Sequence, residues 1–588
     1  MYTKKHSIYQ VFTRLFGNKN TQNTPWGSIE KNGVGKFSDF TDTALTEIKE
    51  LGITHIWYTG VPHHALINDY KDIGVSDDHP SVVKGRAGSP YAVKDYYSVN
   101  PDLADDPTQR LEEFQALIKR SHDNGLKVII DIVPNHIARN YEGLNNPEGI
   151  CDFGDQDDTT IEYHRNNNFY YIPNSSFELP DIDPAFLPLG GEQHPALSSP
   201  FLETPAKWTG NGSRLSKPNF DDWYETVKIN YGIRPDGSKD FPELPNDYAK
   251  RDHLAHYHFW QDVDVPNSWV KFRDIALYWL EKGVDGFRYD MAEMVPVEFW
   301  SYLNSSIKMK NQDAFLMAEV YQPDLYRDYI HLGKMDYLYD KVDLYDGLKA
   351  IMQGKASTAI IPEIQHQMMD IEHHMMHFLD NHDEQRVASP EFVGNPQIAK
   401  PAMLVSTLLS SSPTMIYFGQ EVGEPGAENA GFGQPSRTSI FDYIGVPQHQ
   451  KWMNGGKFDG GQLNEQEKQL RTFYQRVMTF ALEHSSMTGK YLDLHQSGQL
   501  SDSIYAFLRF DKQELVIAAT NFSQSTTENI QLKIVAEVIQ ELGIVDGNYA
   551  VNEHIEGIQQ LTLSVENGVG YLNAELKPLA ALAWVLTM

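Results

Sequence analysis

The sequence predicts an α/β protein: a closed (β/α)8 barrel (a TIM barrel) followed by a separate all-β domain. Eight short apolar runs alternate with segments in which apolar residues recur every three or four positions, which is the pattern of buried parallel strands separated by helices. After residue 484 the runs alternate with turns and show little helical periodicity, as in a β-sandwich. A doubly wound open sheet is the alternative for the first part, but no glycine-rich phosphate turn follows the first run.

The eight predicted strands are short runs of apolar residues. They cover residues 7–12, 54–61, 127–134, 284–290, 314–321, 335–340, 373–380 and 414–421. The helices between them are amphipathic. Segment 41–51 has apolar residues spaced by three and is followed by Gly52 at the position of a helix C-cap, and segment 107–124 is followed in the same way by Gly125. Eight strand–helix units of this kind suit closure into a barrel.

The alternation of strand and helix is lost between the third and the fourth run. Residues 137–265 are rich in Asn, Asp, Pro and Gly, and the helical pattern returns near residue 267. The sequence therefore predicts a barrel domain in two parts, residues 1–136 and 266–484. Residues 137–265 form a domain inserted after strand 3, and residues 485–588 form a C-terminal all-β sandwich.

The composition excludes several classes of protein. The 80 acidic and 49 basic residues give a net charge of −31, which repels nucleic acid and anionic membranes. No stretch approaches 18 consecutive apolar residues, so no membrane-spanning helix is predicted. The single cysteine, Cys151, cannot form an internal disulfide or a Cys-rich zinc site. Aromatic residues make up 12% of the chain, which suits an enzyme that stacks rings against sugar faces.

The N-terminal segment MYTKKHSIYQVF lacks the apolar core and the small-residue cleavage site of a signal peptide. A cytoplasmic location is therefore expected if Met1 is the native N-terminus. If a leader has been removed, a periplasmic or exported protein is expected instead.

Polar and charged residues gather where the predicted strands end. In a parallel barrel the carboxyl ends of all strands share one rim, and this rim carries the active site. The residues at these ends are Asp131, Asn135, His136, Arg288, Asp290, Glu319, Asp380, Asn381, His382 and Asp383. One polar residue at a strand end is commonly a cap or a solvated side chain, but four strand ends of this kind predict a catalytic site.

Clustered carboxylates without a set of His and Cys metal ligands are what glycoside hydrolysis needs. A retaining glycosidase uses one carboxylate as nucleophile and one carboxylic acid as proton donor, with pKa values pushed apart. Arg288 lies two residues before Asp290, on the same strand face, where its charge would keep Asp290 ionised. Apolar neighbours would keep Glu319 protonated as the acid. Asp383 could bind sugar hydroxyl groups and stabilise the transition state.

Four motifs, in this order, resemble the conserved regions of the α-amylase family, glycoside hydrolase family 13. They are Asp131-Ile-Val-Pro-Asn-His136, Gly286-Phe-Arg-Tyr-Asp290, Ala318-Glu319 and Phe378-Leu-Asp-Asn-His-Asp383. The resemblance implies that Asp290 is the nucleophile, Glu319 the general acid/base and Asp383 the aspartate that stabilises the transition state. The substrate-binding residues that it implies are Tyr91, which matches the tyrosine that stacks on the sugar, and His136, Arg288 and His382.

The resemblance extends over about residues 7 to 588 and implies a domain B inserted after strand 3 and a β-sandwich domain C. It also implies a retaining hydrolase that cleaves α-1,4-glucosidic bonds in starch, glycogen or maltooligosaccharides. An α-glucan transglycosylase, an α-glucosidase or a debranching enzyme with the same triad is the alternative. A non-catalytic glucan-binding protein is a remote alternative, because such a protein would be expected to lack catalytic acids and all three are present here. The expected partner is an α-glucan or maltooligosaccharide substrate and no nucleic acid; no oligomeric state is predicted.

Calcium is the one cofactor that the resemblance suggests, and no organic cofactor is expected. In many family members, the asparagine matching Asn135 and the carbonyl of a histidine four residues after the nucleophile bind calcium. Here the second position is Met294, preceded by Glu293 instead of the common lysine; a backbone ligand survives this substitution. Asn18 and Asn20, in the loop GNKNTQN, resemble the spaced oxygen ligands of a small calcium loop. The candidate ligands of a structural calcium ion are therefore Asn18, Asn20 and Asn135.

Overall fold

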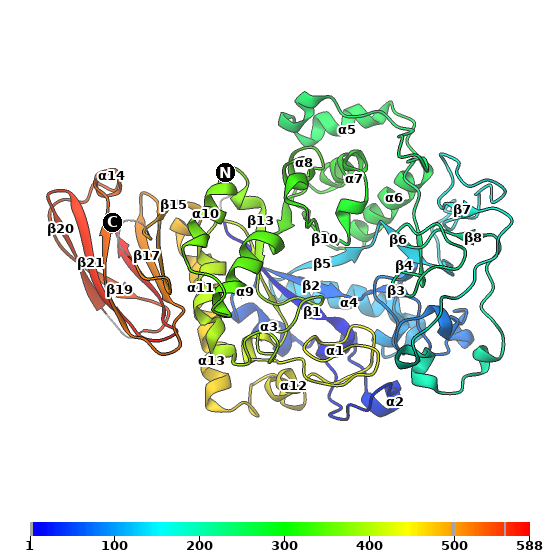
Figure 1. Cartoon of the computed structure of the whole chain (residues 1–588), viewed down its shortest axis with the longest axis horizontal. Helices are drawn as coiled ribbons and strands as arrows, with labels where there is room; N and C mark the ends of the chain where they lie inside the picture. Colours follow the sequence, from blue (N-terminus) through cyan, green and yellow to red (C-terminus); the bar gives the residue numbers. More distant parts are fainter. Residues whose placement is uncertain (1–3, 496–499, 558–559) are drawn as a thin grey trace.

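The computed structural model describes residues 4–495, 500–557 and 560–588. Its centre is a closed barrel of eight parallel strands (Figure 1). In order around the barrel they are β1 (Ser7–Phe12), β2 (His55–Thr59), β5 (Lys127–Ile132), β10 (Gly286–Tyr289), β11 (Phe315–Ala318), β12 (Tyr337–Tyr339), β13 (Met375–Phe378) and β14 (Thr414–Tyr417), which pairs with β1. Each strand lies within one of the eight predicted apolar runs, so the predicted barrel is confirmed.

The barrel strands are continuous apolar segments because both of their faces are covered. Every residue of β1, β2, β10 and β11 is buried, and β5 exposes its first residue, Lys127. The register of the strands places Asp131 of β5 opposite Arg288 of β10, and Arg288 opposite Met317 of β11. Side chains alternate along a strand, so Glu319, two residues beyond Met317, follows on the same face.

Helices surround the barrel (Figure 1). They are α1 (Thr13–Phe16), α2 (Ile29–Asn32), α3 (Asp42–Glu50), α4 (Arg110–Asp123), α6 (Asn267–Glu281), α7 (Val297–Lys310), α8 (Tyr326–His331), α9 (Asp346–Met352), α10 (Ile360–Gln367), α11 (Lys400–Leu408), α12 (Pro447–Met453) and α13 (Glu465–Glu483). In α3, Thr41 caps the helix by accepting the N–H of Ala44, and Gly52 ends the turn with a φ of 89°. No helix of the described residues is long and apolar enough to cross a membrane.

The segment between β5 and β10 contains little regular structure, as predicted. Two short antiparallel pairs are β6 (His136–Ala138) with β9 (Thr226–Lys228), and β7 (Tyr171–Ile172) with β8 (Ala206–Lys207); a similar pair after β2 is β3 (Pro62–His64) with β4 (Val93–Val99). The predicted domain boundary at 136/137 therefore falls inside β6. The segment ends in α5 (His253–Gln261), which packs against α7. The sequence pattern did not indicate α5, because only His256 and Trp260 of its residues are buried.

Eight antiparallel strands follow α13 and form the C-terminal domain, at the left of Figure 1. They are β15 (Lys490–Asp493), β16 (Ile504–Phe510), β17 (Glu514–Asn521), β18 (Glu528–Ile534), β19 (Gly547–Glu553), β20 (Gln560–Glu566), β21 (Val569–Leu576) and β22 (Ala581–Thr587), with α14 (Ala536–Glu541) after β18. Hydrogen bonds join them into one sheet, in which two residue pairs link β19 to β22. Leu508 and Ile517 from one half of the sheet and Leu563 and Leu572 from the other share one apolar core.

The strands β16, β17 and β22 stand between two apolar cores. In β16, Ala506 and Leu508 belong to the core of the C-terminal sheet, whereas Tyr505 and Phe507 belong to the core of the barrel. Helix α11 of the barrel contacts both β17 and β22. These strands are therefore buried on both faces, which attaches the C-terminal domain to the barrel through apolar contacts.

Candidate active site

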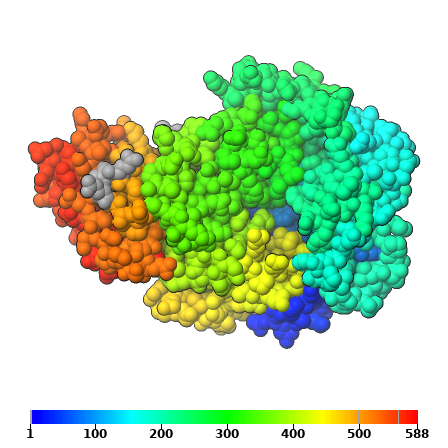
Figure 2. All heavy atoms as spheres, viewed as in Figure 1, coloured from blue at the N-terminus to red at the C-terminus, as the bar shows by residue number. Residues whose placement is uncertain are grey.

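A cavity of about 390 Å3 lies at the rim formed by the carboxyl ends of the barrel strands. The acids Asp290, Glu319 and Asp383 all line it, together with Tyr91 and His136. Figure 2 shows a recess where the barrel, the loop after β14 (yellow) and the inserted segment (teal) meet. The volume lies in the range of small-ligand pockets. The structure thus brings side chains from five distant positions of the chain into one cavity.

Arg288 is the centre of the acid cluster. Its guanidinium group is fully buried and donates hydrogen bonds to Asp290 and Glu319, each at 2.8 Å. A longer contact of 3.4 Å reaches Asp131, and the Nε–H group donates to the hydroxyl group of Tyr339 at 3.1 Å. A planar guanidinium group that binds several partners is fixed in orientation, so Asp290 and Glu319 are held by one rigid group.

A tight turn after β10 presents backbone N–H groups to Glu319. Met291 has a left-handed φ of 43°, and its N–H group donates to a carboxylate oxygen of Glu319 at 3.0 Å. The N–H group of Ala292 donates to the backbone carbonyl of Glu319, also at 3.0 Å. A positive φ at a residue other than glycine is uncommon and is concentrated at functional sites. The turn fixes the carboxyl group of Glu319 close to Asp290, the residue that precedes the turn.

Asp383 reaches the cavity from the loop that follows β13. Asn381 shapes this loop, because its side-chain oxygen accepts the N–H groups of Asp383 and Glu384, both at 2.8 Å. His382 lies between Asn381 and Asp383 in the chain. Its side chain is fully buried, and its Nε2 lies 3.1 Å from the carboxylate of Asp383. The loop therefore directs the carboxylate of Asp383 into the cavity and places the ring of His382 against that carboxylate.

Neutral rings form the wall beside the acids. Tyr91 stacks on His382 with ring centroids 5.3 Å apart, and its hydroxyl group contacts Nε2 of His382. The amide group of Gln10 lies 2.8 Å from Nδ1 of His382, and Nε2 of His136 lies 4.0 Å from the carboxylate of Asp290. Burial lowers the pKa of His136 to about 3 and that of His382 well below its usual value, so both rings are neutral at pH 7.

Burial and the repulsion between carboxylates raise the pKa values of Asp290 and Asp383. Burial raises the pKa of Asp290 well above its usual value, and the opposing charge of Arg288 does not cancel this effect. The pKa of Asp383 rises to about 7, first through burial and then through the charge of Glu319. Arg288 thus favours the ionised form of Asp290, as expected, but the expectation that it outweighs burial is wrong. Both shifts favour the protonated form, so the cluster binds a proton more readily than free carboxyl groups do.

The raised pKa of Asp383 has a consequence for stability. A carboxyl group whose pKa is higher in the folded chain than in the unfolded chain lowers the free energy of unfolding as the pH rises from about 4 to about 7. Asparagine cannot ionise. We therefore expect Asp383→Asn to raise the midpoint of thermal unfolding at pH 8 and to leave it almost unchanged at pH 4, as measured by calorimetry.

The expected gain from Asp383→Asn is limited by solvent. A shift from the usual value to about 7 corresponds to roughly 4 kcal/mol, but 41% of the side chain is exposed to the cavity. Screening reduces the expected gain at pH 8 to about 1 kcal/mol. Asp221→Asn, at an exposed position of the inserted segment, is the control. Equal effects of Asp383→Asn at both pH values would contradict the raised pKa.

Several residues that line the cavity do not lie at the predicted strand ends, so the sequence pattern did not indicate them. They are Lys84, Ser89, Trp223, Glu225, Thr226, Met291, Tyr321, Glu384, Arg437, Ile440 and Phe441. Tyr321 had a signal, because it lies two residues after Glu319 and so on the same side of an extended chain. Most of the others come from irregular segments, in which no periodicity relates a side chain to the barrel rim.

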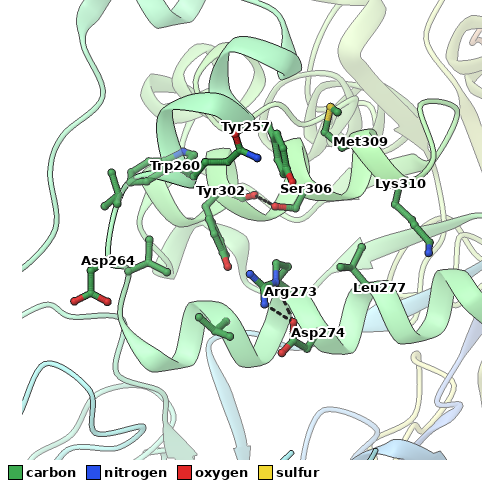
Figure 3. A pocket seen from close by; sticks show the side chains of 14 residues that line it. Tyr257, Trp260, Asp264, Arg273, Asp274, Leu277, Tyr302, Ser306, Met309 and Lys310 are labelled. Carbon is green, nitrogen blue, oxygen red and sulfur yellow. Dashed lines mark hydrogen bonds and ion pairs between the residues drawn. The ribbon is translucent and has the colours of Figure 1, made fainter. Parts of the chain in front are cut away.

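Two larger cavities lie away from the rim. One, of about 710 Å3, lies between α5, α6 and α7 (Figure 3), and the other, of about 740 Å3, lies on α6 beside Tyr97 and Tyr278. The acids that line them are each in an ion pair with an arginine or a lysine: Asp264, Asp274 and Glu281. The rim cavity, with its cluster of acids around one arginine, is therefore the candidate active site.

The asparagines suggested as calcium ligands are engaged in hydrogen bonds. The side-chain oxygen of Asn18 accepts the N–H group of Asn20 at 3.0 Å, and that of Asn20 accepts the N–H group of Gln22 at 2.8 Å. The side-chain oxygen of Asn135 accepts a hydrogen bond from the ammonium group of Lys228. In the described part of the chain, no three His, Cys, Asp or Glu side chains are grouped to hold a metal ion. The residues present do not fit a calcium ion at either place.

Comparisons with known proteins agree with this fold. The family model described as "Alpha amylase, catalytic domain" matches residues 10–174 and 256–455. Neopullulanase 2 of Thermoactinomyces vulgaris is 21% identical over 546 residues, which cover 90% of this chain and 72% of that protein. A cyclomaltodextrinase of Bacillus sp is 21% identical over 551 residues, which cover 88% and 73%. The crystal structure of an α-amylase from Geobacillus thermoleovorans, complexed with acarbose, has a TM-score of 0.60 and 18% identity over 100% of this chain and 99% of that one.

The barrel and its rim of acids define a glycoside hydrolase. The family match covers more than half of the chain, on both sides of the insertion, and the chain belongs to the α-amylase family, glycoside hydrolase family 13. It is an enzyme that hydrolyses α-glucans.

Proposed function

We propose that this protein is a retaining glycoside hydrolase that cleaves α-1,4-glucosidic bonds in starch, glycogen or maltooligosaccharides. The observation that carries the proposal is the shared arginine: the two Nη atoms of Arg288 bind Asp290 and Glu319, one each. Carboxyl groups stand roughly 5 to 5.5 Å apart in retaining glycosidases and roughly 6.5 to 9.5 Å apart in inverting ones. Two acids that bind one guanidinium group support the closer spacing.

We propose one role for each of the three acids in the cavity. In the first step Asp290 attacks the anomeric carbon while Glu319 donates its proton to the glycosidic oxygen, so that the leaving sugar departs and a covalent glycosyl ester forms. In the second step Glu319 takes a proton from water, whose oxygen attacks the anomeric carbon and releases Asp290. Asp383 stabilises the positive charge that develops on the sugar ring in both steps. Two inversions give net retention.

The walls of the cavity support a neutral sugar as substrate. Tyr91 offers an aromatic ring and the neutral ring of His136 offers hydrogen-bonding atoms to hydroxyl groups, whereas His382 is fully buried and stacks behind Tyr91. The net charge of −31 disfavours anionic polymers. The names of the relatives, a neopullulanase and a cyclomaltodextrinase, support an α-glucan.

Product analysis tests the proposal. Maltoheptaose, pullulan and sucrose are digested in parallel, and the anomeric form of the first products is followed by NMR. We expect maltooligosaccharides to be released from maltoheptaose in the α form. Longer chains from maltoheptaose would favour a transglycosylase, glucose alone an α-glucosidase, and cleavage of pullulan without cleavage of maltoheptaose a debranching enzyme. Products in the β form would contradict a retaining mechanism.

An ion pair crosses one wall of the cavity. The ammonium group of Lys84 lies 2.7 Å from the carboxylate of Glu225 and 5.8 Å from the centre of the Phe441 ring, and all three residues line the cavity. Glu225 directly precedes Thr226 of β9, which lies opposite Ala138 of β6, the strand that begins at His136. His136 follows β5 and Glu319 follows β11. These two strands flank β10 on opposite sides. The ion pair thus lies toward the end of the cavity away from the proton donor.

This position indicates a role in the length of the products. The leaving sugar must lie on the side of Glu319, so the ion pair limits the room for sugars on the non-reducing side of the cleaved bond. We expect Lys84→Ala to shift cleavage of maltoheptaose labelled at its reducing end toward longer fragments from the non-reducing end. A change in product ratio of about threefold corresponds to roughly 0.7 kcal/mol in relative transition-state energies.

Chromatography of the labelled and unlabelled products measures this ratio. The control is Lys207→Ala, because Lys207 also pairs with a glutamate, 3.8 Å from Glu203, but belongs to the inserted segment and does not line the cavity. An unchanged ratio in Lys84→Ala would show that the ion pair does not limit substrate binding.

A further inference from the structure

The side chain of Lys228 lies at the junction between the barrel and the inserted segment. Lys228 is the last residue of β9 and lies opposite His136 in the pair that β9 forms with β6. Its ammonium group donates to the side-chain oxygen of Asn135 and lies 3.4 Å from the backbone carbonyl oxygen of Met294. These two acceptors come from the segments that follow β5 and β10, so one lysine bridges two neighbouring strand ends.

Both segments support the acid cluster. Asn135 directly precedes His136, and its side-chain nitrogen lies 3.0 Å from Nδ1 of that ring. Met294 ends the turn after β10, and at the start of this turn the N–H group of Met291 donates to Glu319. A cation that binds both Asn135 and Met294 therefore holds the ring of His136 in place. It also holds the turn whose N–H group donates to Glu319.

The partners of Lys228 are neutral oxygens. Within the described residues no ion pair joins its ammonium group to a carboxylate, and its contacts go to one amide and one backbone carbonyl. Calcium prefers such oxygens, but it takes about six to eight of them, with carboxylates commonly among them. An ammonium group at this distance also repels a second cation. A positive charge is thus already present where the family resemblance suggests a metal ion.

We propose that the ammonium group of Lys228 is the built-in cation of this junction and positions the segments that carry His136 and contact Glu319 without calcium. Lys228 does not line the cavity, so it acts as a positioning residue. The proposal concerns how two strand ends are held and does not depend on which glucan is cleaved.

The wild-type protein gives the first test. Its thermal unfolding is followed by calorimetry after dialysis against EGTA and again after addition of calcium chloride. We expect the two midpoints to agree within about 1 °C, because a ligand that does not bind the folded chain does not stabilise it. Calcium titrated into the chelator-treated protein is expected to give no saturable heat. A midpoint that falls on chelation and returns with calcium would overturn the proposal.

Removal of the charge gives the second test. Lys228→Met keeps the length of the side chain, and we expect its unfolding midpoint to fall by about 3 °C or more. We expect kcat to fall at least about tenfold with a smaller change in KM, because the loss affects positioning more than sugar binding. Lys228→Arg should restore part of kcat, and Lys207→Met is the control for loss of a lysine in the same segment. Wild-type stability and kcat in Lys228→Met would show that the ammonium group is not needed.

A variant that replaces the ammonium group of Lys228 by a carboxylate, which can bind calcium, gives the third test. Lys228→Asp removes the ammonium group that repels a second cation and adds one carboxylate to the two oxygens that Lys228 contacts, so that water has to supply the remaining oxygens of a calcium site. We expect calcium to raise the unfolding midpoint of Lys228→Asp and to leave those of the wild type and Lys228→Met unchanged. Lack of any calcium response in Lys228→Asp would show that these oxygens do not form a cation site, and would overturn the proposal.

Discussion

Asp290→Ala is expected to lower kcat for maltooligosaccharides by at least about a thousandfold while the protein stays folded, because no other group can form the glycosyl ester. Glu319→Ala is expected to cause a similar loss for substrates with a sugar as leaving group, since the glycosidic oxygen then departs without a proton. Kinetics on maltoheptaose, with circular dichroism to confirm folding, measure both effects.

Azide distinguishes the roles of the two acids. With an activated substrate such as α-glucosyl fluoride, azide can enter the space left in Asp290→Ala and attack the anomeric carbon directly, which gives the β-glucosyl azide. In Glu319→Ala the ester on Asp290 still forms, and azide then attacks it and gives the α-glucosyl azide. The opposite pattern of anomers, or a near-normal rate in either variant, would overturn the assignment.

Arg288→Met is expected to reduce both stability and activity. The variant leaves the buried carboxylates of Asp131, Asp290 and Glu319 without their cation, and breaking a buried charge pair costs about 3–5 kcal/mol. The charge of Arg288 lowers the pKa of Asp290, so its loss raises that pKa further. A nucleophile with a higher pKa is protonated up to a higher pH, so the acidic limb of kcat/KM should move to higher pH. The loss of stability should be largest at high pH, where the acids ionise.

Arg288→Lys separates charge from geometry. Lysine keeps a positive charge but cannot bind Asp290 and Glu319 through one rigid planar group. We expect Arg288→Lys to recover much of the stability lost in Arg288→Met and little of the activity. Profiles of kcat/KM from pH 4 to 9 and calorimetry at pH 5 and 8 measure these effects. An acidic limb that stays in place in Arg288→Met would contradict the role of Arg288 in setting the pKa of Asp290.

The barrel was predictable because its signal is local. A parallel strand covered on both faces needs an uninterrupted apolar run, and segments 127–134 and 314–321 are such runs. The acids Asp290 and Glu319 were predictable for the same reason, since each lies at or close to the end of a run and all runs of a parallel barrel end at one rim. The alternation of side chains along β10 also placed Arg288 beside Asp290.

The inserted segment and its contributions to the cavity were not predictable in this way. Trp223, Glu225 and Lys228 lie in or beside a three-residue strand within a long irregular stretch, where no periodicity indicates which side chain turns inward. Helix α5 has only two buried residues, His256 and Trp260, and therefore lacks a wide apolar stripe. The hydrogen bond from Lys228 to Asn135 joins residues far apart in the chain, and nothing in the residues near either one indicates it.

Apolar periodicity and the residues that end each run were enough to establish the barrel, the shared rim and the three acids, because these depend on neighbours along the chain. Three properties appeared only in the folded chain. They are the balance of pKa values around Arg288, the ion pair between Lys84 and Glu225, and the position of Lys228 where calcium was proposed. Burial and charge–charge distance set these properties. Both depend on segments that are brought together only when the barrel closes and the insertion packs against its rim.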